Sequence, residues 1–303
     1  MIDYATLQFR QALPLWMKVE YTKKRIRDWY DSYNGDVYIA FSGGKDSTVL
    51  LHIVRSLYPY VPAVFVDTGL EYPEIREFVR GVDNVVWLCP MKTFKQVIER
   101  YGYPVISKKV SMGLDRYRNT KSPKQRHLRL YGGVNPTSGK KQYRTIPKKW
   151  HFLTGAPFDC SDRCCAILKK APFVKYEKLT GNKPFIGTMA CDSNVRQQDY
   201  LKSGCNAYSN NKPRSTPMAF WLEQDVWDYI DQNDVSYSDI YKMGYRRTGC
   251  MFCMFGVNRE AEPNRFQMME RTHPAQYTYC MDRLGLRRVL GFLGVSVTTE
   301  IRE

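Results

Sequence analysis

Apolar and polar positions change in a regular way within the first sixty residues. Residues 37–41 are nearly all apolar and β-prone, residues 42–47 are small or polar, and apolar positions resume from Val49. An apolar run without alternation is typical of a strand that is buried on both faces of a parallel sheet. The pattern therefore predicts a strand, a loop and a helix within residues 36–52.

The same change of pattern continues along the chain. Short apolar runs predict further strands, and segments with apolar positions at helical spacing predict helices between them and before residue 36. The additional strands are predicted at 61–67, 85–88 and 183–189, and the additional helices at 71–80, 93–101 and 224–230. Strands that alternate with helices indicate an α/β fold with a parallel sheet and helices on both faces, in which ligands bind at the carboxyl ends of the strands.

Two glycines occupy the predicted loop between the first strand and its helix. Because Gly43 and Gly44 lack side chains, the backbone can approach a ligand closely, and the free N–H groups of the first helical turn favour an anion. Phosphate is the anion that we expect. The spacing is not that of a Walker A loop, since Lys45 directly follows the glycine pair.

A net charge of +16 suggests a polyanionic partner. Residues 116–150 contain eleven Lys or Arg and no Asp or Glu, and Tyr117, Tyr131, Tyr143 and Trp150 lie among them. Such a segment is typical of proteins that follow a phosphate backbone and stack on bases, so DNA or tRNA is an expected partner. The alternative is a solvated basic loop that folds over the phosphates of a bound nucleotide.

The sequence predicts no membrane segment. No apolar stretch approaches the roughly 20 residues that span a bilayer, and the N-terminus lacks the pattern of a signal peptide. We therefore expect a cytoplasmic protein that is not attached to a membrane. The nine cysteines are then expected as thiols or metal ligands, because the compartment is reducing and the number is odd.

Two cysteine groups differ from the rest. Cys164 and Cys165 are adjacent, and Cys250 and Cys253 form a C-x-x-C pair. Four thiolates are the ligands that a zinc ion or an iron–sulfur cluster needs. Since neighbouring side chains diverge, the adjacent pair favours a four-iron cube over a single tetrahedral ion. Cys160 could replace one member of that pair, because it lies four residues before Cys164 and shares its face if the segment is helical.

The remaining cysteines are scattered, and we expect them to be buried or incidental thiols. They are Cys89, Cys191, Cys205 and Cys280.

Residues Ser42–Ser47 (Ser-Gly-Gly-Lys-Asp-Ser) resemble the SGGxDS signature of the PP-loop family, the adenine nucleotide alpha hydrolases, which cleave ATP between its α and β phosphates. Other patches are similar to motifs of the phosphoadenosine phosphosulfate (PAPS) reductase-like branch of this family. These patches are Asp67–Glu74, Gly187–Arg196, Pro217–Trp221 and Asp225–Ile230. The Cys-Cys pair with Lys169 and Pro172 beyond it, followed much later by C-x-x-C, is similar to the pattern of the iron–sulfur members of the branch.

The resemblance implies roles for the matching residues. The loop would hold the phosphates of ATP, PAPS or adenosine phosphosulfate (APS), and the stretch after the second strand would border the adenosine. These cofactor-binding residues are Ser42, Gly43, Gly44, Ser47, Asp67, Thr68 and Gly69. The implied catalytic residues are Lys45, Asp46 and Arg196, which with Mg²⁺ can stabilise the charge that develops on pyrophosphate. The implied ligands of a [4Fe–4S] cluster are Cys164, Cys165, Cys250 and Cys253.

The motifs divide the chain into three regions. Residues 1–35 form an N-terminal helical segment, and residues 36–205 form the PP-loop nucleotide-binding domain. This domain carries a polar, basic insertion at about 112–156, which is too long for an ordinary connection, so we expect an inserted segment or a mobile loop. Residues 206–303 form a cysteine-rich C-terminal region that completes the metal-cluster site.

The resemblance leaves several functions open. We expect an ATP pyrophosphatase, similar to the iron–sulfur subunit of DNA phosphorothioation systems and to tRNA-thiolating PP-loop enzymes, which activates a substrate for sulfur transfer from a sulfur donor protein. The alternative is a PAPS or APS reductase of sulfur assimilation. Such a reductase needs a mobile cysteine near the C-terminus, whereas the last cysteine here is Cys280. The third possibility is a non-catalytic nucleotide-binding regulator.

Overall fold

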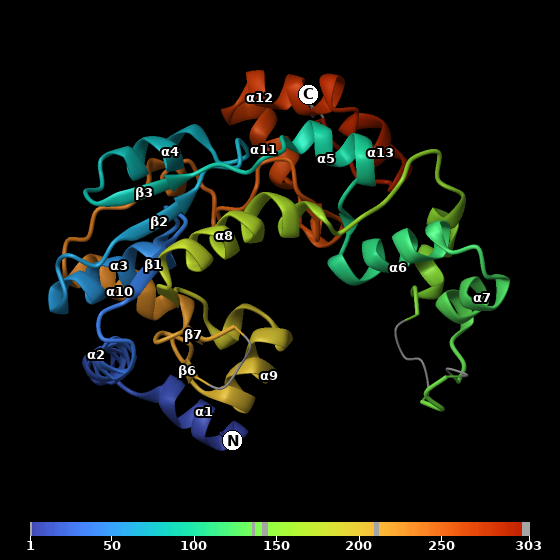
Figure 1. The fold of residues 1–303 in the computed structure, drawn as a ribbon. Coiled ribbons are helices and arrows are strands. Elements are labelled where there is room, and N and C mark those ends of the chain that lie inside the picture. The colour runs from blue at the N-terminus through green and yellow to red at the C-terminus, as the bar shows by residue number, and fades with distance from the viewer. Residues whose placement is uncertain (1, 135–136, 141–144, 209–211, 299–303) are drawn as a thin grey trace. The chain divides into compact units, whose positions relative to one another are not determined.

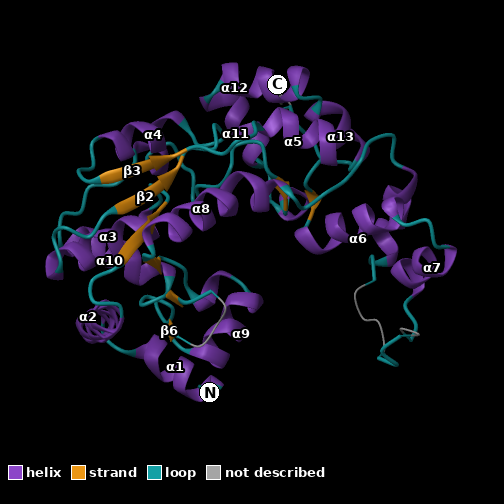
Figure 2. Ribbon diagram, in the orientation of Figure 1, coloured by secondary structure: helices purple, strands orange, loops and turns teal. Residues whose placement is uncertain are grey.

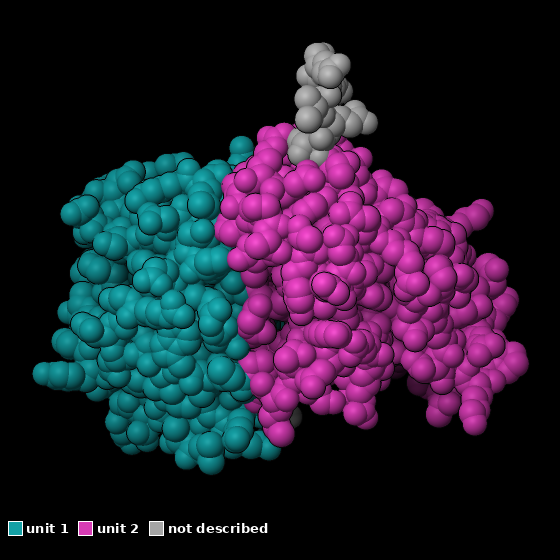
Figure 3. All heavy atoms as spheres, turned by 90° about the horizontal axis from the view of Figure 1, so that it is seen from above, with its two compact units in different colours: residues 1–67, 71–89, 172–248 teal, residues 68–70, 90–171, 249–303 magenta. Residues whose placement is uncertain are grey.

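The chain forms two compact units in the computed structural model, which describes residues 2–134, 137–140, 145–208 and 212–298 (Figure 3). Unit 1 comprises Met1–Asp67, Glu71–Cys89 and Pro172–Thr248, and unit 2 comprises Thr68–Leu70, Pro90–Ala171 and Gly249–Glu303. Each unit is therefore assembled from segments that are distant in sequence. The division of the sequence at residues 35 and 205 stays a prediction.

Unit 1 contains a six-stranded sheet whose pairings are parallel except at one edge (Figures 1 and 2). Its order is β3 (Val85–Leu88), β2 (Ala63–Val66), β1 (Val37–Phe41), β5 (Lys183–Ile186), β7 (Arg214–Ser215) and β6 (Asn206–Ala207). The predicted parallel α/β fold is confirmed, and β1 lies inside the sheet as its apolar run requires. Strand β5 ends at Ile186, three residues before the predicted end. Gly187 then passes close to the backbone of Asp46 and Ser47, at the start of α3 (Lys45–Leu57).

Helices cover both faces of this sheet. Tyr38 and Phe41 lie on opposite faces of β1, because side chains alternate along a strand. Tyr38 packs against Phe173 and Tyr176 of α8 (Ala171–Thr180), whereas Phe41 packs against Phe78 of α4 (Pro73–Arg80). The other helices of unit 1 are α1 (Tyr4–Ala12), α2 (Leu15–Ser32), α3 (Lys45–Leu57), α9 (Asn194–Ser203) and α10 (Glu223–Gln232), with the short 3₁₀ helices η3 (Ala190–Asp192) and η4 (Asp239–Tyr241).

Unit 2 is mainly helical and has one small sheet. Its two strands, β4 (Val105–Ile106) and β8 (Met254–Phe255), pair in parallel. The α-helices are α5 (Phe94–Tyr101), α6 (Lys108–Asn119), α7 (Pro123–Tyr131), α11 (Arg265–Thr272), α12 (Pro274–Thr278) and α13 (Leu286–Phe292). The remaining turns are the 3₁₀ helices η1 (Lys148–Gly155) and η5 (Val257–Arg259) and the π-helices η2 (Cys165–Lys170) and η6 (Tyr279–Arg283).

The basic segment within unit 2 is more ordered than a loop. It contributes the end of α6, all of α7 and part of η1, and Ser122 caps α7 by accepting a hydrogen bond from the N–H of Gln125. Arg118 donates hydrogen bonds to the carbonyl oxygens of residues 153, 154, 156 and 158 and pairs with Asp159. The expectation of a mobile loop is therefore corrected for its described part, whereas Lys141 and Tyr143 lie outside the described residues.

No helix in the described part of the chain combines the length and the apolar character needed to cross a bilayer.

Candidate functional site

The loop Ser42–Ser47 joins β1 to α3 at the carboxyl end of the strand. Gly43 has a φ of 71°, a value that favours glycine, and a Cβ there would lie within 3 Å of Ile75 and Val79. Gly44 is the N-cap of α3, so the N–H groups of Lys45, Asp46 and Ser47 belong to its first turn. The predicted geometry, a glycine turn that leads into a helix N-terminus, is present.

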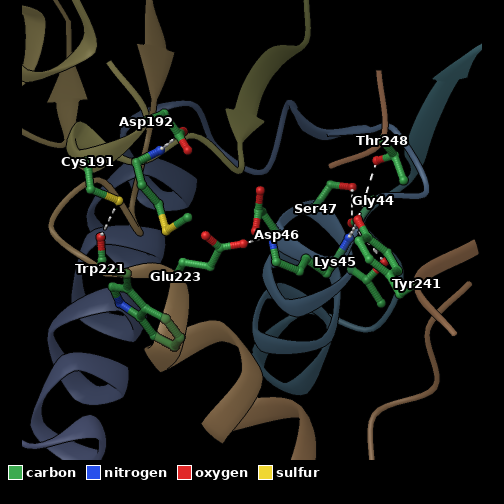
Figure 4. Close-up of polar contacts among 12 residues, drawn as sticks. Gly44, Lys45, Asp46, Ser47, Cys191, Asp192, Trp221, Glu223, Tyr241 and Thr248 are labelled. Carbon is green, nitrogen blue, oxygen red and sulfur yellow. Dashed lines mark hydrogen bonds and ion pairs between the residues drawn. The ribbon is translucent and has the colours of Figure 1, made fainter. Parts of the chain in front are cut away.

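Hydroxyl oxygens accept the hydrogen bonds of this loop. The N–H of Ser42 donates to Oγ of Ser47 at 3.2 Å, and the N–H of Gly44 donates to Oγ of Ser42 at 3.4 Å. The N–H of Lys45 donates to the hydroxyl oxygen of Tyr241 at 2.8 Å (Figure 4). The N–H groups of Ser42, Gly44 and Lys45 are thus all directed at side-chain oxygens.

A pocket of about 500 Å³ lies at this loop, entirely within unit 1. This volume falls in the range of small-molecule sites. Residues from several elements line it besides the loop itself, and Figure 4 shows some of them. They are Met189, Cys191, Asp192, Arg196, Glu223, Tyr241, Arg247 and Thr248.

Lys45 is only 4% exposed, and its charge is neutralised inside the pocket. Its Nζ lies 3.2 Å from Oδ1 of Asp46 and 3.1 Å from Oε1 of Glu223, and 5.8 Å and 5.9 Å from the ring centroids of Trp227 and Tyr241. Burial alone would lower the pKa of Lys45, but the two carboxylates raise it above the ordinary value. Lys45 is therefore a fixed positive charge at the loop.

The negative charge of Asp46 is disfavoured in the folded protein. Burial raises its pKa above the ordinary value, the negative charges of Asp192 and Glu223 add to that effect, and Lys45 opposes it. Its Oδ1 is buried and lies 3.2 Å from the ammonium group of Lys45, and it has no further partner within the described part of the chain. An oxygen in that position is suited to a cation that enters with the ligand.

Arg196 lies in the same pocket, on the first turn of α9. Ser193 caps this helix and places Arg196 beside Asp192, with which it forms an ion pair. The same carboxylate oxygen of Asp192, Oδ2, also accepts a hydrogen bond of 3.0 Å from the N–H of Met189. Phosphate binding by Arg196 would thus exchange one anionic partner for another.

The other residues expected near the nucleotide lie elsewhere. Asp67 forms an ion pair of 2.9 Å with Arg76 of α4 and does not line the pocket. Thr68 and Gly69 belong to unit 2, where Oγ1 of Thr68 accepts a hydrogen bond from the N–H of Leu70 and Gly69 has a φ of 74°. Their predicted role stays a prediction.

The four cysteines expected to hold a cluster all belong to unit 2. Cys164 precedes the π-helix η2, and Cys165 is its first residue. Interaction with the thiol of Cys165 and burial raise the pKa of Cys164, and the nearby thiols of Cys250 and Cys253 raise it further. The same interaction lowers the pKa of Cys165 to about 6, with help from Lys108 and Lys169.

This donor set fits an iron–sulfur cluster by its chemistry. Four thiols from two segments lie within electrostatic range, and Lys108 and Lys169 favour the thiolate form of Cys165, the form that a metal requires. Among the described residues, no group of three or more Cys, His, Asp or Glu side chains converges as tightly as a single metal ion needs. A cube with iron at its corners requires less convergence.

Cys160 is placed differently from these four. It is 1% exposed and pairs with Tyr103 in an isolated β-bridge. Burial raises its pKa to about 12, and the charges that modify this pKa are those of Arg118 and Asp159. Its surroundings are thus those of a structural thiol.

Several residues of the pocket were not predicted from the sequence as site residues. Glu223, Tyr241 and Thr248 carry the contacts around Lys45 and Gly44, and Cys191, which we expected to be incidental, lines the same pocket. Thr248 lies two residues before the C-x-x-C pair and Cys191 lies within the patch Gly187–Arg196, but neither pattern indicates a contact with the loop. Burial raises the pKa of Cys191 to about 11, so this thiol is protonated at neutral pH.

Comparison with known proteins agrees with this geometry. The sequence model of the phosphoadenosine phosphosulfate reductase domain matches residues 36–106 and 124–255, which is more than half of the chain. The chain belongs to this family. As a family member, it is a PP-loop enzyme of the PAPS reductase type, and both the phosphate loop and the C-x-x-C pair lie within the matched residues.

Similar proteins include an adenosine 5'-phosphosulfate reductase of Lysinibacillus sphaericus, 24% identical over 75% of this chain and 77% of that protein. An uncharacterized protein of Methanocaldococcus jannaschii is 23% identical over 86% of this chain, which spans only 51% of that protein. Among solved structures, the U34-tRNA thiolase of Methanococcus maripaludis with its [4Fe-4S] cluster superimposes with a TM-score of 0.38 at 14% identity, covering 95% of this chain and 84% of that one.

Proposed function

We propose that this family member binds ATP at the loop Ser42–Ser47 and cleaves it to AMP and pyrophosphate, in order to activate a nucleic acid for sulfur transfer. The observation that carries the proposal is the pocket of about 500 Å³ in which the loop and the side chains of Lys45 and Arg196 converge. Fixed N–H groups and positive charges at the start of a helix suit the pyrophosphate end of ATP.

The reaction would proceed by attack of a substrate oxygen on the α phosphorus. The bond from this phosphorus to the α–β bridging oxygen breaks, and pyrophosphate leaves with the electron pair. In the pocket, the N–H groups of Gly44 and Lys45, the ammonium group of Lys45 and the guanidinium group of Arg196 would stabilise the developing charge. A sulfur donor then displaces AMP from the activated substrate.

Two bound groups complete the proposal. Asp46 would help to hold Mg²⁺, since its carboxylate lines the pocket and its Oδ1 has no partner among the described residues besides the ammonium group of Lys45. Cys164, Cys165, Cys250 and Cys253 would hold a [4Fe–4S] cluster. When bound, such a cluster supplies electron-transfer and sulfur-binding chemistry.

Nucleic acid is the proposed acceptor because of the basic segment 116–150 in unit 2. Arg118 is used within the fold, but other cations are exposed: Arg116, Lys121, Lys124, Arg126, Lys140, Lys148 and Lys149. Tyr131 is 67% exposed and available for stacking on a base. The proposed acceptor is DNA, as in phosphorothioation, or tRNA. The proposed sulfur donor is a separate protein, and the proposed location is the cytoplasm.

The products distinguish the candidate functions. Anaerobically purified protein is incubated with ATP, PAPS and APS in separate reactions, and pyrophosphate, AMP and sulfite are measured. We expect AMP and pyrophosphate from ATP. ADP and orthophosphate would contradict the proposal, and failure to convert any of the three nucleotides while still binding ATP would indicate a regulator.

The second candidate is sulfonucleotide reduction, which the similarity to an adenosine 5'-phosphosulfate reductase favours. This reaction needs a mobile, nucleophilic cysteine. Cys280 is fully buried, and burial raises its pKa to about 12, so it is unsuited to that role in this structure. Sulfite release from APS or PAPS with a thiol reductant would establish this alternative.

A further inference from the structure

The phosphate loop already has an oxygen ligand from another part of the chain. The hydroxyl oxygen of Tyr241, which lies 196 positions away, accepts a hydrogen bond of 2.8 Å from the N–H of Lys45. This N–H belongs to the first residue of α3 and has no acceptor inside the helix. A phosphate bound at the loop would require the same N–H.

The contact is close because Gly44 leaves room for it. A Cβ at Gly44 would lie 2.7 Å from Oγ1 of Thr248 and 3.3 Å from the hydroxyl oxygen of Tyr241. These two hydroxyl groups are 3.4 Å apart and meet over the backbone of the loop (Figure 4). The missing side chain that should admit a phosphate therefore admits two protein hydroxyl groups instead.

The ring of Tyr241 is held in place by two other rings. It packs edge-on against Trp227 at 5.5 Å and against Tyr237 at 6.1 Å. The 3₁₀ helix η4 that carries it is capped by Ser238, whose side chain accepts a hydrogen bond from the N–H of Ile240, and both of these residues are buried. The hydroxyl oxygen is thus presented to the loop by a packed element.

The side chain of Lys45 is occupied in a parallel way. Its ammonium group contacts Oε1 of Glu223, a residue at the start of α10, at 3.1 Å. Groups outside the loop therefore contact both the N–H and the side chain of Lys45, and Asp46 of the loop is a second partner of its ammonium group. A phosphate must replace at least the neutral hydroxyl, because two oxygens cannot share that N–H at full strength.

We infer that Tyr241 is an internal competitor for phosphate, whose hydroxyl oxygen occupies the anion position of the loop and leaves when a nucleotide binds. The inference rests on the proposed function, since it concerns the same loop. Its consequence is that the affinity for the pyrophosphate group is set partly by η4. The contact between Tyr241 and the loop is then present when the site is empty and lost when a nucleotide binds.

The test uses inorganic pyrophosphate and calorimetry on the full chain, purified anaerobically. Tyr241→Phe keeps the ring and removes only the competing oxygen, so we expect pyrophosphate to bind about three- to ten-fold more tightly, the equivalent of one hydrogen bond. Tyr237→Phe is the matched control, because it removes a hydroxyl from the same ring cluster, and it should leave the affinity unchanged. Equal or weaker binding by Tyr241→Phe overturns the inference.

Hydrogen exchange on the wild type gives an independent measurement if the variant folds poorly. Pyrophosphate should slow exchange in residues 42–47 and accelerate it around residues 237–243, since η4 loses its contact with Lys45. Slower exchange in both segments would mean that Tyr241 is part of the phosphate cradle, which overturns the inference. If neither wild type nor variant binds pyrophosphate or ATP, the proposed function fails as well.

Discussion

The ammonium group of Lys18 lies 2.7 Å from both carboxylate oxygens of Asp225 and joins α2 to the first turn of α10. Lys18 is only 2% exposed, and Asp225 also accepts a hydrogen bond from the N–H of Leu222. The same turn carries Glu223, the partner of Lys45. The N-terminal helices therefore support an element of the pocket.

Lys18→Met should destabilise the protein by about 3–5 kcal/mol, because it leaves the carboxylate of Asp225 buried without its counter-ion. The free energy of unfolding is measured with urea. Lys23→Met removes a half-buried lysine of the same helix, whose partner Glu20 is exposed, and should cost less than about 1 kcal/mol. Equal effects of the two substitutions would contradict the assignment of Lys18 as a buried charge pair.

Gly44→Ala should weaken pyrophosphate binding at least ten-fold, and Gly44→Val should abolish it. The backbone angle of Gly44, φ of −81°, is open to any residue, so the effect would come from the added carbon at the loop and not from strain. Gly81→Ala is the control, because φ is −79° there and a Cβ would meet nothing closer than 3.5 Å. The affinity of all three variants for pyrophosphate is measured by calorimetry. An unchanged affinity in Gly44→Val would exclude close approach of a ligand to the backbone at Gly44.

Much of the fold could be predicted from local pattern. The limits of β1 follow from a fully apolar run between Asp36 and Ser42, and Thr93 begins α5 with a reciprocal capping interaction with Gln96. The two-residue strands β4, β6, β7 and β8 could not be predicted, because two residues show no periodicity. Within the basic segment, polar composition concealed the helices.

The loop of the candidate site was predictable, but its partners were not. The sequence Ser42–Ser47 predicts a phosphate loop by itself, since its glycines and helix start are adjacent. Tyr241 and Glu223 reach Lys45 from distant segments, and neither belongs to a motif of its own. Such contacts arise from tertiary packing, which a single sequence does not display.

Asp46→Asn should change the pH dependence of stability. Because burial raises the pKa of Asp46 in the folded state, the folded protein binds a proton more readily than the unfolded chain, and this residue contributes more stability as pH falls. Between the unfolded pKa of 3.8 and the raised folded pKa, the free energy of unfolding of the wild type should therefore rise relative to that of the variant as pH decreases. Urea titrations of both proteins from pH 7 to pH 4 test this sign.

The same substitution separates stability from activity. At pH 7 Asp46→Asn should be at least as stable as the wild type, since a disfavoured buried charge is removed. ATP cleavage should nevertheless fall more than ATP binding, because the buried Oδ1 is the proposed cation ligand. Full activity of the variant at unchanged Mg²⁺ requirement would exclude Asp46 from metal binding.

Anaerobic purification should give a brown protein with about four iron atoms per chain. Cys250→Ser and Cys253→Ser should each remove the colour and lower the melting temperature, since the ligands join two distant segments. Cys205→Ser is the control, because Cys205 is a buried thiol of unit 1. Stoichiometric zinc without iron would contradict the cluster. A Cys160→Ser variant that keeps its iron would support the other four cysteines as ligands.

The basic segment yields a prediction about salt. Lys140, Lys141, Lys148 and Lys149 are replaced together by Ala, and binding to duplex DNA and to tRNA is measured over a range of salt concentrations. Each phosphate contact contributes about −0.9 to the slope of log affinity against log salt for duplex DNA. If all four lysines contact phosphates, the slope should become shallower by about three to four, and affinity should fall.

ATP cleavage without nucleic acid is the matched measurement, because it reports on the loop in unit 1. The quadruple variant should retain it if the segment binds nucleic acid. Lys178→Ala with Lys202→Ala removes two lysines from helices of unit 1 and should leave the slope nearly unchanged. The opposite outcome has two parts: the wild type shows no salt-dependent binding to nucleic acid, and the quadruple variant loses ATP binding. This outcome would show that the lysines act on the nucleotide. Sulfonucleotide reduction would then become the better proposal.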